Sequence, residues 1–303
     1  MISFPNGRIF AYDGYDEEVI EYTDYRNPIK KLTVKDLTKP AKILKPSKNG
    51  ELLLLNHLNS LDVYRIRQEA KMTLLSSFVT EDQSDLADFE ALSRNRIIMA
   101  STSGLVSLET IPGSRPSSLN YKNQPRAAPT KISTKINLSA ADPDFDESCI
   151  ITCLTVSPSS SLAVISTART DKRFQQKCQS GLYLLELGDK AEPLRIIGSL
   201  KTGMEGISKK GRCYTHMRLY QSQKAQGLIL LCFEGRYGFM EIFEKEMGPM
   251  GYLMDVYLVH GNQIRFLETV KGFHKGRTFD NVLRAGVLWT VDSTGIIRAL
   301  TLQ

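Results

Sequence analysis

Short apolar hairpins recur along the chain, and they constrain its fold more than any other feature. Each one consists of an apolar or alternating run, a turn of Gly, Ser, Asn or Asp, and a second run. Enrichment in β-branched and aromatic residues between turn residues is the hairpin signal. Helical periodicity is nearly absent. The six predicted hairpins begin at Arg8, Glu51, Arg96, Ser161, Gly227 and Gly286. Six similar units in one chain indicate a repeat architecture.

The spacing of the hairpins suggests the size of the repeat. The intervals between their first residues are 43, 45, 65, 66 and 59 residues, and propeller blades run about 40–45. The first two intervals therefore fit, and the others need longer loops. Further strands are expected at 29–34, 72–79, 131–138, 150–156, 194–200 and 215–220. Four strands per unit is the propeller count. Residues 255–270 could form another hairpin, so six and seven blades both remain open.

In the hairpin that begins at Gly227, the first run is 227–233 and the predicted second run is 238–243. The last hairpin ends on residues 300–302, which are expected to form the third strand of its blade. Residues 2–4 are then available as a fourth strand from the N-terminus. Such a closure would remove open sheet edges, so we expect it here.

The composition is that of an ordinary globular chain. It has 303 residues, 42% of them hydrophobic, and 39 Lys plus Arg against 33 Asp plus Glu, a net charge of +6. These values exclude collagen, coiled coil and a disulfide-stapled miniprotein. The five cysteines are odd in number and irregularly spaced, which suggests reduced thiols in the cytosol or nucleus. Residues 1–10 show no secretory signal, and residues 149–168 fit two strands better than a membrane helix.

Three segments carry a resemblance to a known family. Residues 291–302, VDSTGIIRALTL, are similar to the strand-turn-strand element of WD-repeat proteins. Residues 45–56, KPSKNGELLLLN, and 156–167, VSPSSSLAVIST, resemble the Ser-Pro-Asp-Gly turn that leads into an apolar strand in that family. The sequence departs from the pattern in two places. No Trp-Asp dipeptide closes a repeat, and the Gly-His pair occurs only in reversed order, as His260 and Gly261.

The resemblance implies an all-β fold, a single WD-repeat-like β-propeller of six or seven four-stranded blades over residues 1–303, with a flexible basic insertion at about 112–131. It implies a non-catalytic scaffold for protein–protein interaction, a propeller subunit of a larger intracellular complex in the cytoplasm or nucleus. Two alternatives stay open: a nucleic-acid-associated propeller that uses basic loops on phosphate, and, ranked last, a propeller hydrolase. Loop length and the use of Lys, Ser and Asn suggest a eukaryotic source.

Charge is unevenly distributed among the predicted loops of one face. Segments 13–18, 81–88 and 142–147 hold twelve acidic residues and no basic one. Segments 169–179, 201–212 and 271–277 hold eleven basic residues and two acidic ones. In a four-stranded blade these loops emerge on the same face. One half of that face would then be acidic and the other basic, which steers and orients a charged partner.

The insertion at 112–131 is rich in Pro, Ser and Asn and has no acidic residue. We read it as a basic arm that folds on an acidic protein or on phosphate. We expect partner proteins with a charged surface, with nucleic acid possible and no insertion into a membrane. The residues expected to contact a partner are Arg115, Lys122, Arg126, Arg169, Lys172, Arg173, Lys209, Lys210, Arg212, Lys275 and Arg277.

The sequence offers no catalytic motif. It lacks the Gly-x-Ser-x-Gly elbow and the glycine-rich phosphate loops. His57 is expected to be a solvated turn residue. Residues 142–153 resemble a calcium loop, but Glu147 and Cys153 stand where Gly and Glu are required, so a solvated acidic loop is expected. Cys149 and Cys153 should share one face of a buried strand. We therefore expect no catalytic residue, no metal site and no cofactor.

Overall fold

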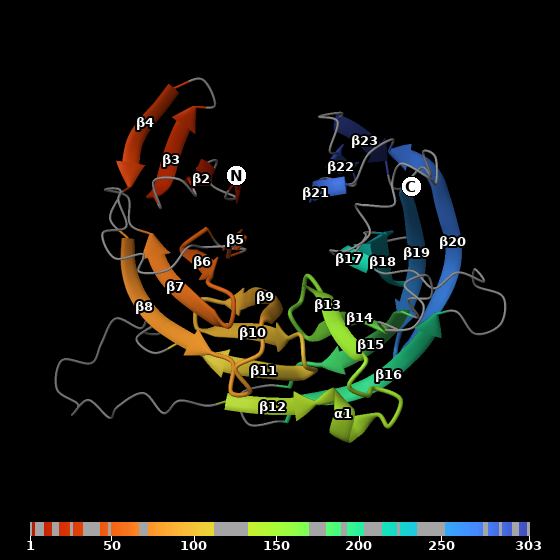
Figure 1. Ribbon diagram of the computed structural model, residues 1–303. Coiled ribbons are helices and arrows are strands. Elements are labelled where there is room, and N and C mark those ends of the chain that lie inside the picture. The colour runs from red at the N-terminus through yellow and green to blue at the C-terminus, as the bar shows by residue number, and fades with distance from the viewer. Residues whose placement is uncertain are drawn as a thin grey trace, which may run out of the picture. The chain divides into compact units, whose positions relative to one another are not determined.

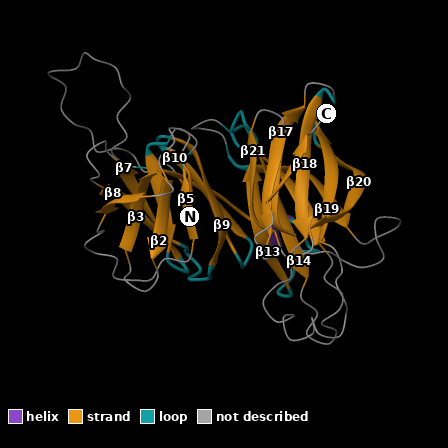
Figure 2. Cartoon of the chain, turned by 90° about the horizontal axis from the view of Figure 1, so that it is seen from above, coloured by secondary structure: helices purple, strands orange, loops and turns teal. Residues whose placement is uncertain are grey.

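The computed structural model describes residues 2–3, 9–13, 18–24, 27–32, 43–47, 50–66, 72–111, 133–169, 180–188, 193–202, 214–222, 225–234, 252–274, 278–284, 287–292 and 297–301. Strands make up almost all of its regular structure, as Figure 2 shows. The single described helix, α1 (Leu138–Ala141), is one turn long. The chain divides into two compact units, Met1–Ile136 and Asn137–Gln303, which are described separately.

The first unit holds three four-stranded sheets whose strands follow chain order (Figure 1). The first sheet contains β1 (Ile2–Ser3), β2 (Ile9–Asp13), β3 (Glu18–Asp24) and β4 (Asn27–Leu32). The second contains β5 (Ile43–Pro46), β6 (Leu52–Asn56), β7 (Ser60–Ile66) and β8 (Met72–Val79). The third contains β9 (Leu86–Ser93), β10 (Arg96–Ser101), β11 (Leu105–Thr110) and β12 (Ser133–Asn137).

The second unit holds three more sheets of the same kind. The fourth sheet contains β13 (Cys149–Val156), β14 (Leu162–Arg169), β15 (Ser180–Glu186) and β16 (Arg195–Thr202). The fifth contains β17 (Tyr214–Ser222), β18 (Gly227–Glu234), β19 (Tyr252–His260) and β20 (Gln263–His274). The sixth, in the described residues, has three strands: β21 (Thr278–Arg284), β22 (Val287–Asp292) and β23 (Ile297–Thr301). The predicted four-stranded unit is thus confirmed in five sheets.

Five of the six predicted hairpins are confirmed, as β2–β3, β6–β7, β10–β11, β14–β15 and β22–β23. The hairpin that begins at Gly227 is wrong, because β18 pairs with β17 on one edge and with β19 on the other. Its predicted second run, 238–243, lies outside the described residues. The hairpin at 255–270 is confirmed as β19–β20, with Gly261 at φ +58° in its turn. It belongs to the fifth sheet and does not start a seventh one.

The predicted pairing of the N-terminal strand with the last blade is also wrong. β1 pairs with β2 in the first sheet, where Ile2 lies opposite Phe10 and Ser3 opposite Ile9. The physical reason is proximity along the chain, since the entropy lost on closing a loop is smallest for a short one. β23 is the third strand of the sixth sheet, as expected.

Neighbouring sheets pack through side chains that alternate along each strand. β18 shows this most clearly, because successive residues of a strand point to opposite faces. Leu230 and Cys232 belong to a core cluster shared with the fourth sheet, whereas Leu231 and Phe233 belong to a second cluster with Leu288 of the sixth. Burial on both faces explains why the run from Gly227 to Phe233 is continuously apolar rather than alternating.

The same arrangement joins the second and third sheets of the first unit. Leu52 and Leu54 of β6 share a cluster with Phe89, Ile97 and Met99 of the third sheet. All five side chains of β6 are buried, including the intervening leucines that point to the other face. Four consecutive leucines are therefore needed to bury both faces of one strand.

A polar network lies inside the fifth sheet. The Asp255 carboxylate is 1% exposed. The Tyr214 hydroxyl donates to its Oδ2 at 2.6 Å, and the Thr269 hydroxyl donates to its Oδ1 at 2.6 Å. The Tyr214 and Tyr257 hydroxyl oxygens are also 2.6 Å apart. Burial, helped by the neighbouring groups, raises the pKa of Tyr214 far above its ordinary value, so the hydroxyl keeps its proton and donates. A buried carboxylate without such donors would be strongly destabilising.

Substitution of a leucine that is buried between sheets tests the packing. Leu230→Ala should lower the free energy of unfolding by about 2–5 kcal/mol, because it removes contacts and leaves a cavity. Leu267, on the same sheet but 41% exposed, is the matched control, and Leu267→Ala should change it by about 0.5 kcal/mol or less. Urea unfolding measures both. Equal losses would contradict the assignment of β18 to the core.

Removal of one donor tests the Asp255 network. Tyr214→Phe should cost about 1–3 kcal/mol in urea unfolding, because the buried carboxylate loses a hydrogen bond. The double variant Tyr214→Phe with Asp255→Asn should cost about 0.5–3 kcal/mol less than the sum of the single variants, as expected for direct partners. Strictly additive losses would show that the two side chains act independently.

Candidate interaction surface

Residues 138–148, the acidic connector between β12 and β13, have a defined conformation. Two of its side chains, Leu138 and Phe145, are buried. Asp142 and Asp146 each accept a hydrogen bond, at 2.9 Å, from the backbone N–H two residues further on. These are Asx turns, in which a short carboxylate replaces the backbone acceptor of a turn. The connector therefore holds its carboxylates in defined positions.

Two cations at the ends of strands form ion pairs with this acidic connector. Arg169, the last residue of β14, places Nη2 2.6 Å from Asp146 Oδ2. Lys201, near the end of β16, forms an ion pair with Asp144. The Tyr183 hydroxyl of β15 donates to Asp142 Oδ2 at 2.9 Å. Burial and the adjacent Asp142 raise the pKa of Tyr183, which keeps the hydroxyl a donor. We call the predicted basic segments 169–179, 201–212 and 271–277 the basic connectors. The acidic connector and the first residues of two of them, Arg169 and Lys201, thus lie together at one edge of the fourth sheet.

Arg169 is the one predicted partner-binding residue within the described parts of the chain, and it is ion-paired with Asp146. The insertion at 112–131 is likewise outside these ranges. The basic contact surface as a whole stays a prediction. The ten predicted residues that fall outside are Arg115, Lys122, Arg126, Lys172, Arg173, Lys209, Lys210, Arg212, Lys275 and Arg277.

The acidic segment 81–88 of the first unit is also internally paired. Asp82 accepts hydrogen bonds from the hydroxyls of Ser84 (2.8 Å) and Ser103. Burial alone would raise the pKa of Asp82, but these hydrogen bonds outweigh it and lower the pKa below 3.8. Glu81 forms an ion pair with Lys135 of β12. The carboxylates of Glu81 and Asp82 therefore stabilise the conformation of this segment through their own contacts.

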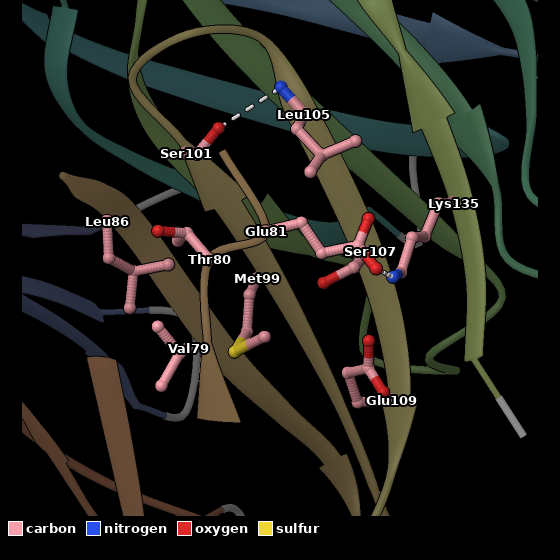
Figure 3. Close-up of a pocket in the computed structure, with 10 residues that line it drawn as sticks. All are labelled: Val79, Thr80, Glu81, Leu86, Met99, Ser101, Leu105, Ser107, Glu109 and Lys135. Atoms are coloured by element: carbon pink, nitrogen blue, oxygen red, sulfur yellow. Dashed lines mark hydrogen bonds and ion pairs between the residues drawn. The ribbon is translucent and has the colours of Figure 1, made fainter. Parts of the chain in front are cut away.

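A hollow opens beside this segment (Figure 3). Its cavity volume is about 20 Å³, which is room for about one water molecule. Figure 3 shows Val79, Leu86 and Met99 toward one side of it, with Thr80 among them, and Glu109, Ser107 and Lys135 toward the other. Its full lining is Val79, Thr80, Glu81, Leu86, Met99, Ser101, Leu105, Ser107, Glu109 and Lys135. No feature of the sequence predicted this hollow.

The expectation that His57 is solvated is wrong. Its side chain is buried in the β6–β7 turn, with Nε2 3.2 Å from Asp62 Oδ2 on β7. Burial alone would raise the pKa of Asp62, but hydrogen bonds from His57 and Ser77 lower it below its ordinary value. The Asp62 carboxylate on the next strand lies beside this buried imidazole.

The cysteines differ in environment. Cys153 and Cys232 are buried in the shared core cluster. Cys149 is partly exposed, and its thiol lies 3.6 Å from the Asp144 carbonyl. A β-bulge between Ile151 and Cys153 interrupts the alternation on which the shared-face expectation rests.

Among the described residues no group of three or more His, Cys, Asp or Glu could hold a metal ion. Within the same residues, no helix is long and apolar enough to cross a membrane.

Comparison with known proteins identifies the fold. No family model matches the sequence, and no curated protein does. Among solved structures, the Nup133 β-propeller domain of Vanderwaltozyma polyspora aligns with 98% of this chain and 83% of its own, with a TM-score of 0.57 and 9% identity. The fold is a β-propeller. A protein from Lactobacillus plantarum is also similar to the propeller, with a TM-score of 0.61 at 12% identity over 98% and 82% of the two chains.

A further structure resembles the propeller, that of Chaetomium thermophilum Sqt1 bound to the N-terminus of the ribosomal protein L10. Its TM-score is 0.55 at 14% identity, and the alignment covers 97% of this chain and 67% of that one. Identities this low establish the fold alone. The β-propeller fold expected from residues 45–56, 156–167 and 291–302 is confirmed.

Acid titration tests the hydrogen bonds of Asp82. Because its pKa is lower in the folded state, the stabilisation is complete above the unfolded pKa and is lost as pH falls through the folded pKa. Between pH 5 and pH 2.5, the free energy of unfolding of Asp82→Asn should therefore fall less steeply than that of the wild type. Glu186→Gln, which removes an exposed carboxylate paired with Arg195, is the charge-matched control. Identical slopes for wild type and Asp82→Asn would contradict the inferred shift.

Proposed function

We propose that this propeller is a non-catalytic protein-interaction scaffold, a subunit of a larger complex in the cytoplasm or nucleus of a eukaryotic cell. One observation carries the proposal. At the edge of the fourth sheet, Asp144, Asp146 and Arg169 are held in defined positions while 67%, 52% and 38% of their side chains remain exposed. A surface that presents both signs of charge orients a charged protein partner more selectively than a uniform one.

Fold-level analogy adds support. The Sqt1 structure is described as bound to the N-terminus of a ribosomal protein. By analogy, the partner of this propeller would contribute a peptide segment or loop. A fold hosts many functions, so the argument rests on the charged edge and the analogy supplements it.

The proposed contact residues extend from this edge into the basic connectors. Arg169 begins one of them and Lys201 another. Since both are paired at the edge, the cations further along the connectors would contact the partner, with the basic arm at 112–131 as a second contact. These proposed residues are Arg115, Lys122, Arg126, Lys172, Arg173, Lys209, Lys210, Arg212, Lys275 and Arg277.

Nucleic acid is the second candidate partner. The three basic connectors hold eleven basic and two acidic residues. Lysine and arginine on phosphate release counterions, so binding of this kind weakens steeply as salt rises. Affinity purification of the tagged protein with and without nuclease separates the candidates. Partner proteins that survive nuclease in stoichiometric amounts support the scaffold, and loss of every partner supports nucleic acid.

Charge reversal tests the basic connectors directly. Lys209→Glu with Lys210→Glu should reduce recovery of the partner proteins at least about tenfold, because like charges would then face each other. Arg265→Glu with Arg298→Glu reverses two exposed charges outside the connectors and is the matched control. Thermal unfolding checks that both variants fold. Unchanged recovery with the lysine variant would rule out this segment as the contact.

A further inference from the structure

The outer edge of β8 is an open sheet edge without charged residues. β8 is the last strand of the second sheet, with β7 on one side and no described strand on the other (Figure 1). Its eight residues, MTLLSSFV, include no charged residue, no proline and no glycine. An open strand edge presents a row of backbone N–H and C=O groups to which another strand can add.

The fourth strands of the other four-stranded sheets contain residues that oppose such pairing. Natural proteins protect sheet edges with charged residues, above all lysine, and with proline. β8 is the exception among these strands, because it has neither. The residues that the other strands contain are Pro28, Lys30 and Lys31 in β4, Lys135 in β12, Arg195 and Lys201 in β16, and Arg265 and Glu268 in β20.

Two large apolar side chains of β8 are exposed on one face of the sheet. Leu74 is 50% exposed and Val79 is 60% exposed. In the pairing with β7, Leu74 lies opposite Tyr64 and Val79 opposite Ser60. Residues four apart on a strand point to the same face. A β-bulge, whose extra residue is Leu75, shifts the register between the two pairs. Leu74 and Val79 therefore share a face.

A carboxylate on this face already has partners within the sheet. Asp62 of β7 lies opposite Ser77, on the face that Leu74 and Val79 share. The Ser77 hydroxyl donates to Asp62 Oδ1 at 2.5 Å, and His57 Nε2 lies 3.2 Å from Asp62 Oδ2. The face of β8 therefore offers apolar contacts rather than a free charge.

The two ends of β8 differ in charge. Arg65 of β7 lies opposite Thr73, near the start of β8. Glu81 and Asp82 follow the other end of the strand, and Lys135 forms an ion pair with Glu81 alone. The second end therefore stays acidic. Two copies aligned antiparallel would bring each basic end to an acidic end, whereas parallel copies would bring like charges together.

We propose that β8 pairs antiparallel with β8 of a second copy of this chain, about a two-fold axis between Leu74 and Val79. Each Leu74 would pack on Val79 of the other copy, and the backbone groups of the two edges would form hydrogen bonds. A two-fold interface joins the same surface patch of both copies, so a neutral, apolar edge suits its own copy. This inference concerns self-association and does not rest on the proposed scaffold function.

Sedimentation velocity of the purified full-length protein tests the proposal. An interface of one strand per copy falls below the roughly 1,200 Å² of total area that stable complexes bury, so dimers should form as the protein concentration rises. We expect the sedimentation coefficient to increase from the monomer value toward that of a dimer. A coefficient that stays at the monomer value up to the solubility limit would overturn the proposal.

Leu74→Lys provides the second test. The two-fold axis would introduce the lysine into the interface twice, and lysine on an edge opposes strand pairing, so the association constant of the dimer should fall at least about tenfold. Leu267→Lys is the matched control, because Leu267 is a 41% exposed leucine on the fourth strand of the fifth sheet. Both changes add one positive charge, and thermal unfolding checks that both variants fold. Unchanged association of Leu74→Lys, or equal losses in both variants, would contradict pairing through β8.

Hydrogen–deuterium exchange locates the interface. Backbone amides of residues 72–79 should exchange more slowly at high protein concentration, whereas those of β20 should not change. A dimer that is protected elsewhere would show that β8 is not the interface. If the protein alone is monomeric and residues 72–79 are protected only in material purified with partner proteins, the occupant is a strand of the partner and the second-copy proposal is wrong. Because the dimer is measured without partners, its failure leaves the scaffold proposal intact.

Discussion

Burial of both faces of the inner strands is the constraint on which the rest of the structure depends. A sheet packed between two others must present apolar side chains in both directions, so β6 needs four consecutive leucines and β18 a continuous apolar run. This packing leaves little room for unpaired polar groups. Asp255 satisfies the constraint with donors from Tyr214 and Thr269. Glu109 satisfies it only in part, which is why it stands out among the buried carboxylates of the described residues.

The sequence predicted the local part of this structure well. Hairpins depend on turn residues and on alternation within a few positions, and these signals are visible in the chain itself. The hairpin predicted at Gly227 is wrong because two apolar runs follow β18, at 238–243 and at 252–260, and local pattern does not distinguish between them. In the structure β18 pairs with the second run, which forms β19. The predicted partner of the N-terminal strand was wrong for a related reason. Local pattern cannot tell whether this strand pairs with the last sheet or with β2 of the first sheet.

The candidate site was less accessible to sequence reasoning. The acidic segment 142–147 was predicted, but its pairing with Arg169 and Lys201 depends on the order of strands in the fourth sheet. Ser107 and Glu109 alternate with Val106 and Leu108, a pattern typical of a strand with one solvated face. Their polar face instead points toward the second sheet. The proximity of the buried His57 to Asp62 likewise depends on the pairing of neighbouring strands.

The backbone conformation of Leu58 lowers the stability of the turn that carries it. A left-handed conformation costs a leucine roughly 1–2 kcal/mol, and glycine would adopt it without that cost. The turn that carries Leu58 is therefore less stable than its own backbone would permit. In exchange, an apolar side chain stands in solvent, on a turn that is hydrogen-bonded to Leu86 in the lining of the hollow. Stability given up at one exposed position in this way is a common property of surfaces shaped for recognition, where the most stable residue and the most useful one differ.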